Sequence, residues 1–335
     1  MTTERRADAH EFANTAYDNV ERELRTKWPN TYKGQTKKGL AELNEDRRLW
    51  LANPPTIITP QMADFHKRLD RQVGKNSQKW YGIEGVPYIG KSHILKSYVD
   101  QFHVDHTEQR PFVSGTEWQP IPVVWLQTPS TFKALMKRFL AFYLADDQQS
   151  GTGPDMVQPV ARLVKKHQTK LIVLDDLHTL PNEKGGIGNH LKHFRDVCGE
   201  AIFLYTATQK ERRKHGGKPE PAAAALRDET GGAQINARAT VLRLDPHSLD
   251  NDWLRLLQQF EKAMPWCYDR RKPQLHQHAS QIHELTGGRC GLLAELLSET
   301  TSLLIEANSK SEDRVTEELL NEAGNEIADA ARIAA

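Results

Sequence analysis

The segment KWYGIEGVPYIGKSHILKS, residues 79–97, decides the fold. Its middle part, from Gly85 to Ser92, matches the pattern GxxxxGK[ST] of a phosphate-binding loop in full. Residues 79–85 are aromatic and apolar, which is typical of a buried strand, and residues 91–103 predict a helix. A surface turn is the alternative, but a strand before the motif and a helix after it favour the phosphate-binding loop. The sequence therefore predicts a nucleotide-binding α/β domain.

Each part of the loop has a physical role. Gly85 and Gly90 let the backbone turn closely and direct its N–H groups inward, and the following helix N-terminus adds a partial positive charge. Lys91 is expected to reach the β- and γ-phosphates, and the Ser92 hydroxyl to coordinate Mg²⁺. We expect ATP and Mg²⁺ as cofactors, in a site formed by Gly85, Val86, Pro87, Tyr88, Ile89, Gly90, Lys91, Ser92 and His93.

A second chemical feature follows the apolar run at 171–174. The sequence LIVLDD, residues 171–176, predicts a buried strand that ends in two acids, although solvated acids at a strand end are also common. Ligands bind at the carboxyl ends of strands in open α/β sheets, so we expect Asp175 to assist Mg²⁺ binding and Asp176 to act as general base. Thr208 ends the next strand, where its side chain could contact the γ-phosphate or the attacking water, with Thr206 as the neighbouring candidate.

Composition excludes several classes of protein. The 335 residues contain 45 Lys and Arg against 44 Asp and Glu, which is unlike a small basic DNA-binding domain. No apolar run reaches the roughly 18 residues of a membrane span, and the first residues lack the apolar core of a secretory signal. The three cysteines are far apart, which argues against a disulfide framework. We expect a cytoplasmic protein.

The order of the predicted elements indicates the domain organisation. Strands at 79–85, 121–127, 171–176, 201–208 and 240–245 alternate with helices, which predicts a parallel sheet flanked by helices. From about residue 248 the pattern is purely helical and predicts a small α-helical lid. We expect four regions: an N-terminal helical extension at 1–55, an α/β ATPase domain at 56–247, the lid at 248–307 and an acidic C-terminal helix or tail at 308–335.

In this order of motifs the chain resembles the AAA+ ATPases, and more closely the TniB and TnsC type of transposition regulators, which are related to MuB. Three segments carry this closer resemblance: LIVLDDLH at 171–178, INARATVLRLDPHSLDNDWLRLLQQFEKAMPW at 235–266 and LTGGRCGLLAELL at 285–297. In the first of them, His178 matches a family histidine. The resemblance covers about residues 55–305. It implies an AAA+ fold and a bacterial protein.

The resemblance also implies a function. Such proteins bind double-stranded DNA through its backbone in an ATP-dependent way, assemble as a helical filament or ring, and recruit the transposase together with a targeting factor. Arg238 would be the finger that reaches a neighbouring nucleotide, with Arg227 as its rival, and Arg289 would be a second sensor in the nucleotide site. Asp176 stands where the family has glutamate, so we expect slow, regulatory ATP hydrolysis.

The DNA-contacting residues are expected after the second strand and before the third. Threonine and lysine side chains suit phosphate contact without sequence readout, although each could equally belong to a solvated helix face. The candidates are Thr128, Thr131, Lys133, Lys137, Lys165 and Lys166.

Two other functions compete with this one. A STAND-like signalling ATPase would act on a protein partner without DNA binding, and a scaffold would use ATP between subunits with negligible turnover. Salt-dependent DNA affinity separates the first alternative from a transposition regulator, and multiple-turnover phosphate release separates the second.

Overall fold

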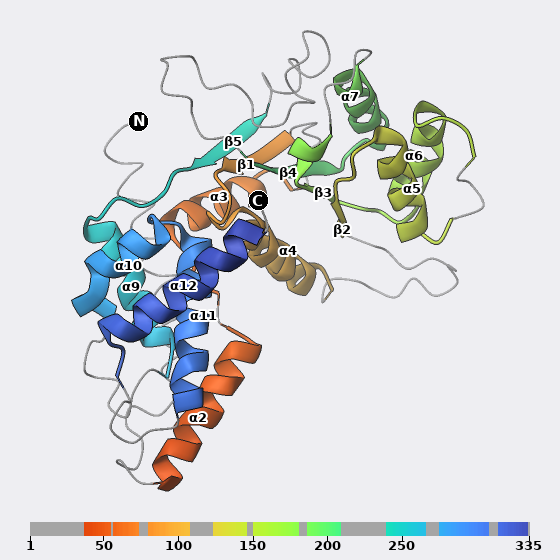
Figure 1. The fold of residues 1–335 in the computed structure, drawn as a ribbon. Coiled ribbons are helices and arrows are strands. Elements are labelled where there is room, and N and C mark those ends of the chain that lie inside the picture. Colours follow the sequence, from red (N-terminus) through yellow and green to blue (C-terminus); the bar gives the residue numbers. More distant parts are fainter. Residues whose placement is uncertain are drawn as a thin grey trace, which may run out of the picture. The chain divides into compact units, whose positions relative to one another are not determined.

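The computed structural model describes residues 37–54, 56–73, 80–107, 123–145, 150–180, 186–208, 239–265, 275–307 and 314–333 (Figure 1). These residues form two compact units. One unit consists of Phe65–Pro87 and Lys91–Asp245, and the other of the residues before Phe65, Tyr88–Gly90 and the residues after Asp245. Most of the expected N-terminal extension, residues 1–36, lies outside the described residues.

The first unit is built on a five-stranded parallel sheet, as the sequence predicts. Its strand order is β2-β3-β4-β1-β5, and every pair of neighbours is parallel. The strands are β1 (Trp80–Gly85), β2 (Val123–Gln127), β3 (Leu171–Asp175), β4 (Ile202–Thr208) and β5 (Thr240–Leu244). Four of the five residues of β3 and six of the seven of β4 are buried, which explains their nearly continuous apolar sequence.

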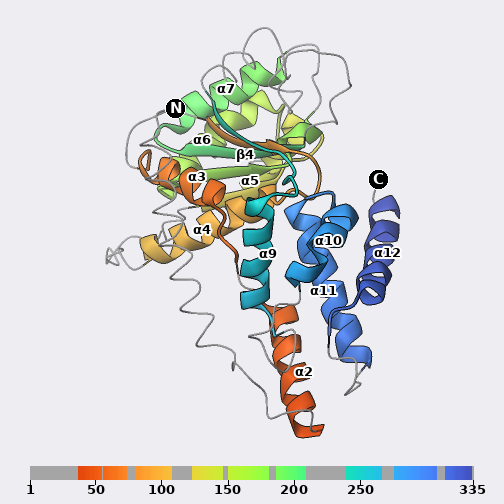
Figure 2. The ribbon, with the colours of Figure 1, turned by 90° about the vertical axis from the view of Figure 1, so that its left-hand side faces the viewer.

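Helices cover both faces of this sheet (Figure 2). On one face lie α3 (Pro60–Asp70) and α4 (Lys91–Thr107), which are joined by a hydrogen bond from the Tyr98 hydroxyl to Asp70 Oδ1 at 3.0 Å. On the other face lie α5 (Phe132–Phe142), α6 (Val157–Lys166) and α7 (Ile187–Cys198). Two short 3₁₀ turns, η2 (Pro154–Met156) and η3 (Leu177–Thr179), complete the connections.

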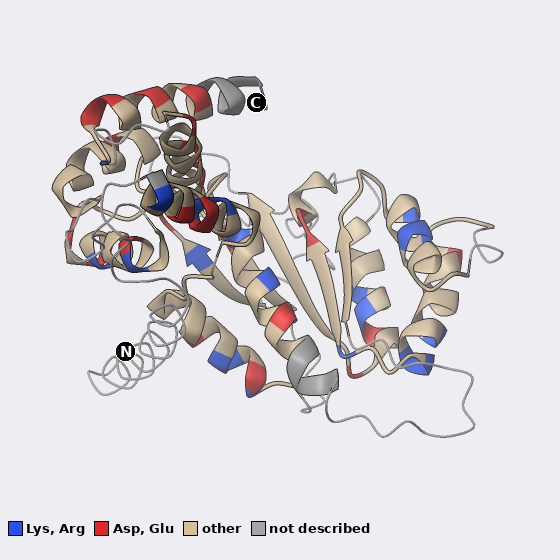
Figure 3. Ribbon diagram, turned by 90° about the horizontal axis from the view of Figure 1, so that it is seen from below, with Lys and Arg blue, Asp and Glu red and all other residues tan. Residues whose placement is uncertain are grey.

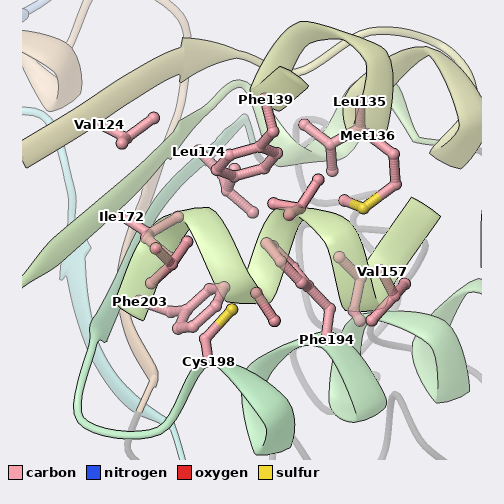
Figure 4. Packing of buried hydrophobic residues seen from close by; sticks show 14 of the residues in the cluster. Val124, Leu135, Met136, Phe139, Val157, Ile172, Leu174, Phe194, Cys198 and Phe203 are labelled. Carbon is pink, nitrogen blue, oxygen red and sulfur yellow. The ribbon is translucent and has the colours of Figure 1, made fainter. Parts of the chain in front are cut away.

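The core beneath α5, α6 and α7 holds the sheet in place. Figure 4 shows Phe139, Phe194 and Phe203 meeting between the helices and the strands. Their rings pack edge to face, with centroids 5.0 Å apart for Phe139 and Phe194 and 5.4 Å apart for Phe194 and Phe203. Edge-to-face pairs add about 0.5–1.5 kcal/mol to the burial of their apolar area. This packing fixes the strand ends that carry the polar residues of the site.

The second unit is helical. It contains α2 (Lys37–Ala52), α9 (Asn251–Ala263), η5 (Leu275–His278), α10 (Ala279–Thr286), α11 (Cys290–Ala307) and α12 (Glu317–Ile333). Its core includes the fully buried Trp253, whose indole N–H donates to the Ala279 carbonyl at 3.2 Å. The buried Arg47 of α2 donates to the Pro265 carbonyl at 3.2 Å. Helix α2 is therefore part of this helical core and is tied to the C-terminal half of the chain.

No helix among the described residues combines the length and the apolar character that a membrane span requires.

A glycine turn between α10 and α11 generates the first prediction. Gly287 and Gly288 both have positive φ, of 56° and 68°, so alanine at either position pays a left-handed penalty of about 1–2 kcal/mol. A Cβ on Gly288 would also lie 2.1 Å from the His247 carbonyl oxygen, whereas one on Gly287 would meet only the Arg289 side chain at 3.9 Å. We expect Gly288→Ala to lower the free energy of unfolding, measured in urea, clearly more than Gly287→Ala. Equal losses in the two variants would contradict the close approach of Gly288 to His247.

Candidate functional site

The phosphate-binding loop connects the end of β1 to the start of α4. Gly90 has φ 98°, a conformation that L side chains rarely adopt, and Tyr88 has φ 61°. These left-handed residues turn the chain from the end of β1 at Gly85 to the start of α4 at Lys91. The backbone N–H groups at the beginning of α4 have no helical partner, so this turn presents donors suited to phosphate oxygens.

Lys91 lies inside the loop and is only 7% exposed. Its ammonium donates to the carbonyls of Gly85 at 3.1 Å and Val86 at 2.9 Å. Burial lowers the pKa of Lys91, and the carboxylates of Asp176 and Asp175 act against this shift. The cation is thus held within the turn of backbone that the motif predicts.

Ser92 and Asp175 meet although 83 residues separate them. The Ser92 hydroxyl donates to Asp175 Oδ1 at 3.1 Å. β4 lies between β1 and β3 in the sheet, so the contact bridges the carboxyl ends of three strands. A serine hydroxyl and a carboxylate beside a phosphate-binding loop are the oxygen donors that suit Mg²⁺. The residues present therefore fit a magnesium-bound nucleotide.

Asp176 does not continue β3 as the sequence pattern predicts. The strand ends at Asp175, and Asp176 adopts a left-handed conformation with φ 56° and ψ 45° that starts η3. Its Oδ1 lies 3.7 Å from His178 Nδ1, and His178 Nδ1 accepts a hydrogen bond from the Thr208 backbone N–H at 3.3 Å. The aspartate expected to be the base therefore sits on a tight turn beside a histidine.

The two threonines at the end of β4 occupy different places. Thr208 pairs with Gly85 in the register of β4 and β1, so it lies beside the first glycine of the loop. Thr206 is fully buried, and its hydroxyl bonds to the Asp175 carboxylate and to the Asp176 backbone. Sequence reasoning placed Thr208 first. Leu174 pairs with Tyr205, which sets Thr206 opposite Asp175. The contact between Thr206 and Asp175 follows from this register, which the sequence does not specify.

His93, Arg289 and Arg238 are the other residues expected at the nucleotide. His93 is exposed on the first turn of α4. Arg289 directly precedes α11 in the helical unit, and its neighbour Gly291 donates its N–H to the Tyr88 carbonyl at 2.7 Å. A Cβ on Gly291 would lie 2.3 Å from that oxygen, so only glycine permits this contact. Arg238, the expected finger, lies outside the described residues, as does its rival Arg227.

The candidate DNA contacts divide into two groups. Lys133 and Lys137 are exposed on α5, and Lys165 and Lys166 are exposed at the end of α6. Figure 3 shows basic residues on these helices, on its right-hand side.

The two candidate threonines, Thr128 and Thr131, differ from the lysines in their surroundings. Thr128 is only 4% exposed, so its side chain does not reach the surface, which corrects its expected role as a DNA contact. The Thr131 hydroxyl caps α5 by accepting the Ala134 N–H at 3.1 Å. The exposed lysines are therefore the remaining candidates for contact with DNA.

Comparisons with known proteins agree with this fold. The family model described as bacterial TniB protein matches residues 47–203, so the sequence resemblance is confirmed over that region. The Aeropyrum pernix ORC2 protein, in a structure of ADPNP-ADP complexes, is similar with a TM-score of 0.58 and 16% identity over 84% of this chain and 72% of that chain. Its ADP form gives a TM-score of 0.54 and 15% identity over 84% and 73%. The comparison with curated protein sequences found no match. The fold is that of an AAA+ domain.

The left-handed Asp176 generates the second prediction. Alanine pays the left-handed penalty at this position and glycine does not, so we expect Asp176→Ala to be less stable than Asp176→Gly by about 1 kcal/mol. Urea unfolding measures the difference. Asp100, which is exposed within α4, provides the matched control. In a helix the order should reverse, so Asp100→Ala should be more stable than Asp100→Gly by about 1 kcal/mol. If Asp176→Ala is the more stable of the two variants, as expected for alanine at Asp100, the backbone of Asp176 is not left-handed.

Proposed function

We propose that the protein is an ATP-dependent regulator of DNA transposition that assembles on double-stranded DNA and recruits the transposase. The observation that carries this proposal is the convergence of Lys91, Ser92 and Asp175 at the carboxyl edge of the sheet, in a chain whose residues 47–203 match the TniB family model. A transposition regulator accounts for both the phosphate chemistry and the family match. A STAND-like switch accounts only for the first.

ATP is the proposed ligand of the loop. The backbone donors at the start of α4 would bind phosphate oxygens, and Lys91 would exchange its bonds to Gly85 and Val86 for bonds to the β- and γ-phosphates. The similar Aeropyrum pernix protein was solved with ADPNP and ADP, which supports an adenine nucleotide. When bound, Mg²⁺ would neutralise phosphate charge, and Ser92 and Asp175 would hold it.

Asp176 is the proposed base for hydrolysis. A carboxylate that orients a water molecule near the γ-phosphate accelerates attack on it, and Asp176 follows directly after the residue proposed to hold the metal. Aspartate is one methylene shorter than glutamate, so its carboxylate reaches less far from the turn. We therefore propose an ATPase with slow, regulatory turnover to ADP and phosphate.

DNA binding is proposed to use the exposed lysines of α5 and α6. Lys133 and Lys137 are one helical turn apart on α5, so their ammonium groups lie on the same side of the helix. Lysine is a flexible point charge that suits contact with the phosphate backbone and carries no sequence readout. Copies of the chain are proposed to line up along the DNA as a filament or ring, with Arg238 reaching the nucleotide of a neighbour.

The role of Lys91 is tested by assembly. We expect Lys91→Ala to weaken ATP binding about 10-fold or more, since it removes a charge-assisted contact, and to abolish ATP-dependent filaments on duplex DNA in electron micrographs. Lys96→Ala is the matched control, because Lys96 lies on the same helix and its exposed ammonium pairs only at the surface, with Asp100 at 3.2 Å. Filament formation by Lys91→Ala, or its absence from the wild-type protein under all nucleotide conditions, would reject the proposal.

The DNA surface is tested by salt dependence. Removing Lys133 and Lys137 together should reduce the slope of log affinity against log salt by about two, roughly one for each lost phosphate contact. Fluorescence anisotropy with a labelled duplex, in the presence of a slowly hydrolysed ATP analogue, measures the slope. Lys170→Ala serves as control because its ammonium pairs with Glu200 at 3.2 Å. An unchanged slope in the double variant would move the DNA surface elsewhere, and salt-independent wild-type affinity would favour the protein-directed switch.

A further inference from the structure

The hydroxyl of Thr206 joins two consecutive acids of the site. Thr206 lies near the end of β4 and its side chain is fully buried. Its Oγ1 accepts the backbone N–H of Asp176 at 2.8 Å and donates to Asp175 Oδ1. One buried group therefore contacts the side chain of the first acid and the backbone of the second.

The direction of both hydrogen bonds is fixed by chemistry. A backbone N–H can only donate, so Thr206 Oγ1 must be its acceptor, and the single hydroxyl proton of Thr206 remains for Asp175. An ionised carboxylate can only accept, so it takes that proton as a hydrogen bond. Thr206 meets both requirements, because it lies opposite Asp175 in the register and is buried.

The same carboxylate oxygen also accepts the hydroxyl of Ser92. Asp175 Oδ1 receives Ser92 Oγ at 3.1 Å from the first turn of α4 and Thr206 Oγ1 from β4. Two donors that arrive from different elements restrict the rotation of the carboxylate. Ser92 belongs to the proposed metal site, whereas Thr206 is buried behind it, so Thr206 supports Asp175 from the side of the sheet.

Asp176 depends on the same threonine through its backbone. A left-handed aspartate costs on the order of 1–3 kcal/mol and persists only where neighbouring groups hold it. The bond from Asp176 N–H to Thr206 occurs at this strained residue. Without it, a partly buried N–H would lose its partner, and the turn would lose a contact that sets the direction of the Asp176 side chain.

We infer that Thr206 is a positioning residue for the magnesium-nucleotide site: its hydroxyl fixes the Asp175 carboxylate and the left-handed Asp176 in the arrangement that the bound metal requires. This inference rests on the proposed nucleotide-binding function. Thr206 contacts both acids, whereas the sequence placed Thr208 first as a contact of the γ-phosphate or the attacking water; the backbone N–H of Thr208 bonds to His178. The inference also predicts that loss of the Thr206 hydroxyl weakens the binding of Mg²⁺ and leaves the binding of the nucleotide phosphates by the loop unchanged.

The experiment compares Thr206→Val with Thr206→Ser in the full-length protein. Binding of a fluorescent ATP analogue is titrated in EDTA and at increasing Mg²⁺, and phosphate release is recorded alongside. Valine keeps the shape of threonine and removes the hydroxyl, whereas serine keeps the hydroxyl. The control is Thr169→Val, at the opposite end of β3, where a buried threonine bonds to the Tyr143 hydroxyl at 2.7 Å.

For Thr206→Val we expect the Mg²⁺ concentration at half-saturation to rise about 10-fold, the factor that corresponds to one charge-assisted hydrogen bond. Affinity in EDTA should stay within about twofold of wild type, since the loop and Lys91 are unchanged. Thr206→Ser should restore the wild-type Mg²⁺ response. Thr169→Val should lower the melting temperature without moving that response. If Thr206→Val does not yield folded protein, Thr206→Ala, which removes the hydroxyl without adding bulk, takes its place beside Thr206→Ser.

Three outcomes overturn the inference, and they are distinguishable. A Thr206→Val protein with the wild-type Mg²⁺ response shows that the hydroxyl does not position the acids. A Thr206→Ser protein as defective as Thr206→Val shows that packing rather than the hydroxyl is responsible. A wild-type protein without affinity for the analogue, with or without Mg²⁺, removes the proposed function and the role of Thr206 with it.

Discussion

One carboxylate oxygen connects the parts of the proposed nucleotide site. Asp175 Oδ1 accepts hydroxyls from Ser92 on α4 and Thr206 on β4, while Asp175 itself ends β3. Three segments that are far apart in the sequence therefore meet at one atom. A shift of one strand by a single residue would turn Thr206 to the other face of the sheet and break this arrangement, because side chains alternate along a strand. The site depends on register more than on any single contact.

The register in turn depends on the apolar core. The rings of Phe194 and Phe203 pack between α7 and β4, and Ile172 of β3 lies in the same buried cluster. These side chains fix β3 and β4 relative to each other without touching the nucleotide site. Burial of strands on both faces requires nearly continuous apolar sequences, which is why polar residues gather at the strand ends. The edge that presents Asp175 and Thr206 is thus a consequence of how the sheet is buried.

Sequence alone predicted the part of this arrangement that local rules determine. The run from 79 to 97 specifies a strand, a loop and a helix, and the structure has β1 and α4 on either side of the loop. The five strands and their parallel orientation follow from the alternation of apolar strands with helices, whereas their order in the sheet does not. Three features lay beyond such reasoning, namely the left-handed turn at Asp176, the contact made by Thr206 and the burial of Thr128. Each depends on partners from a neighbouring strand, which no local pattern specifies.

The conformation of Asp176 links the stability of the fold to the proposed function. A residue with φ 56° would cost less free energy as glycine, yet the chain has a carboxylate there, next to the acid that Ser92 contacts. Strain of this kind is held by surrounding bonds and concentrates at functional sites. Here the holding bond comes from Thr206, and the same hydroxyl orients Asp175. The contact that offsets the strain of one acid therefore also orders the other, so the two acids are coupled through a single buried threonine rather than placed independently.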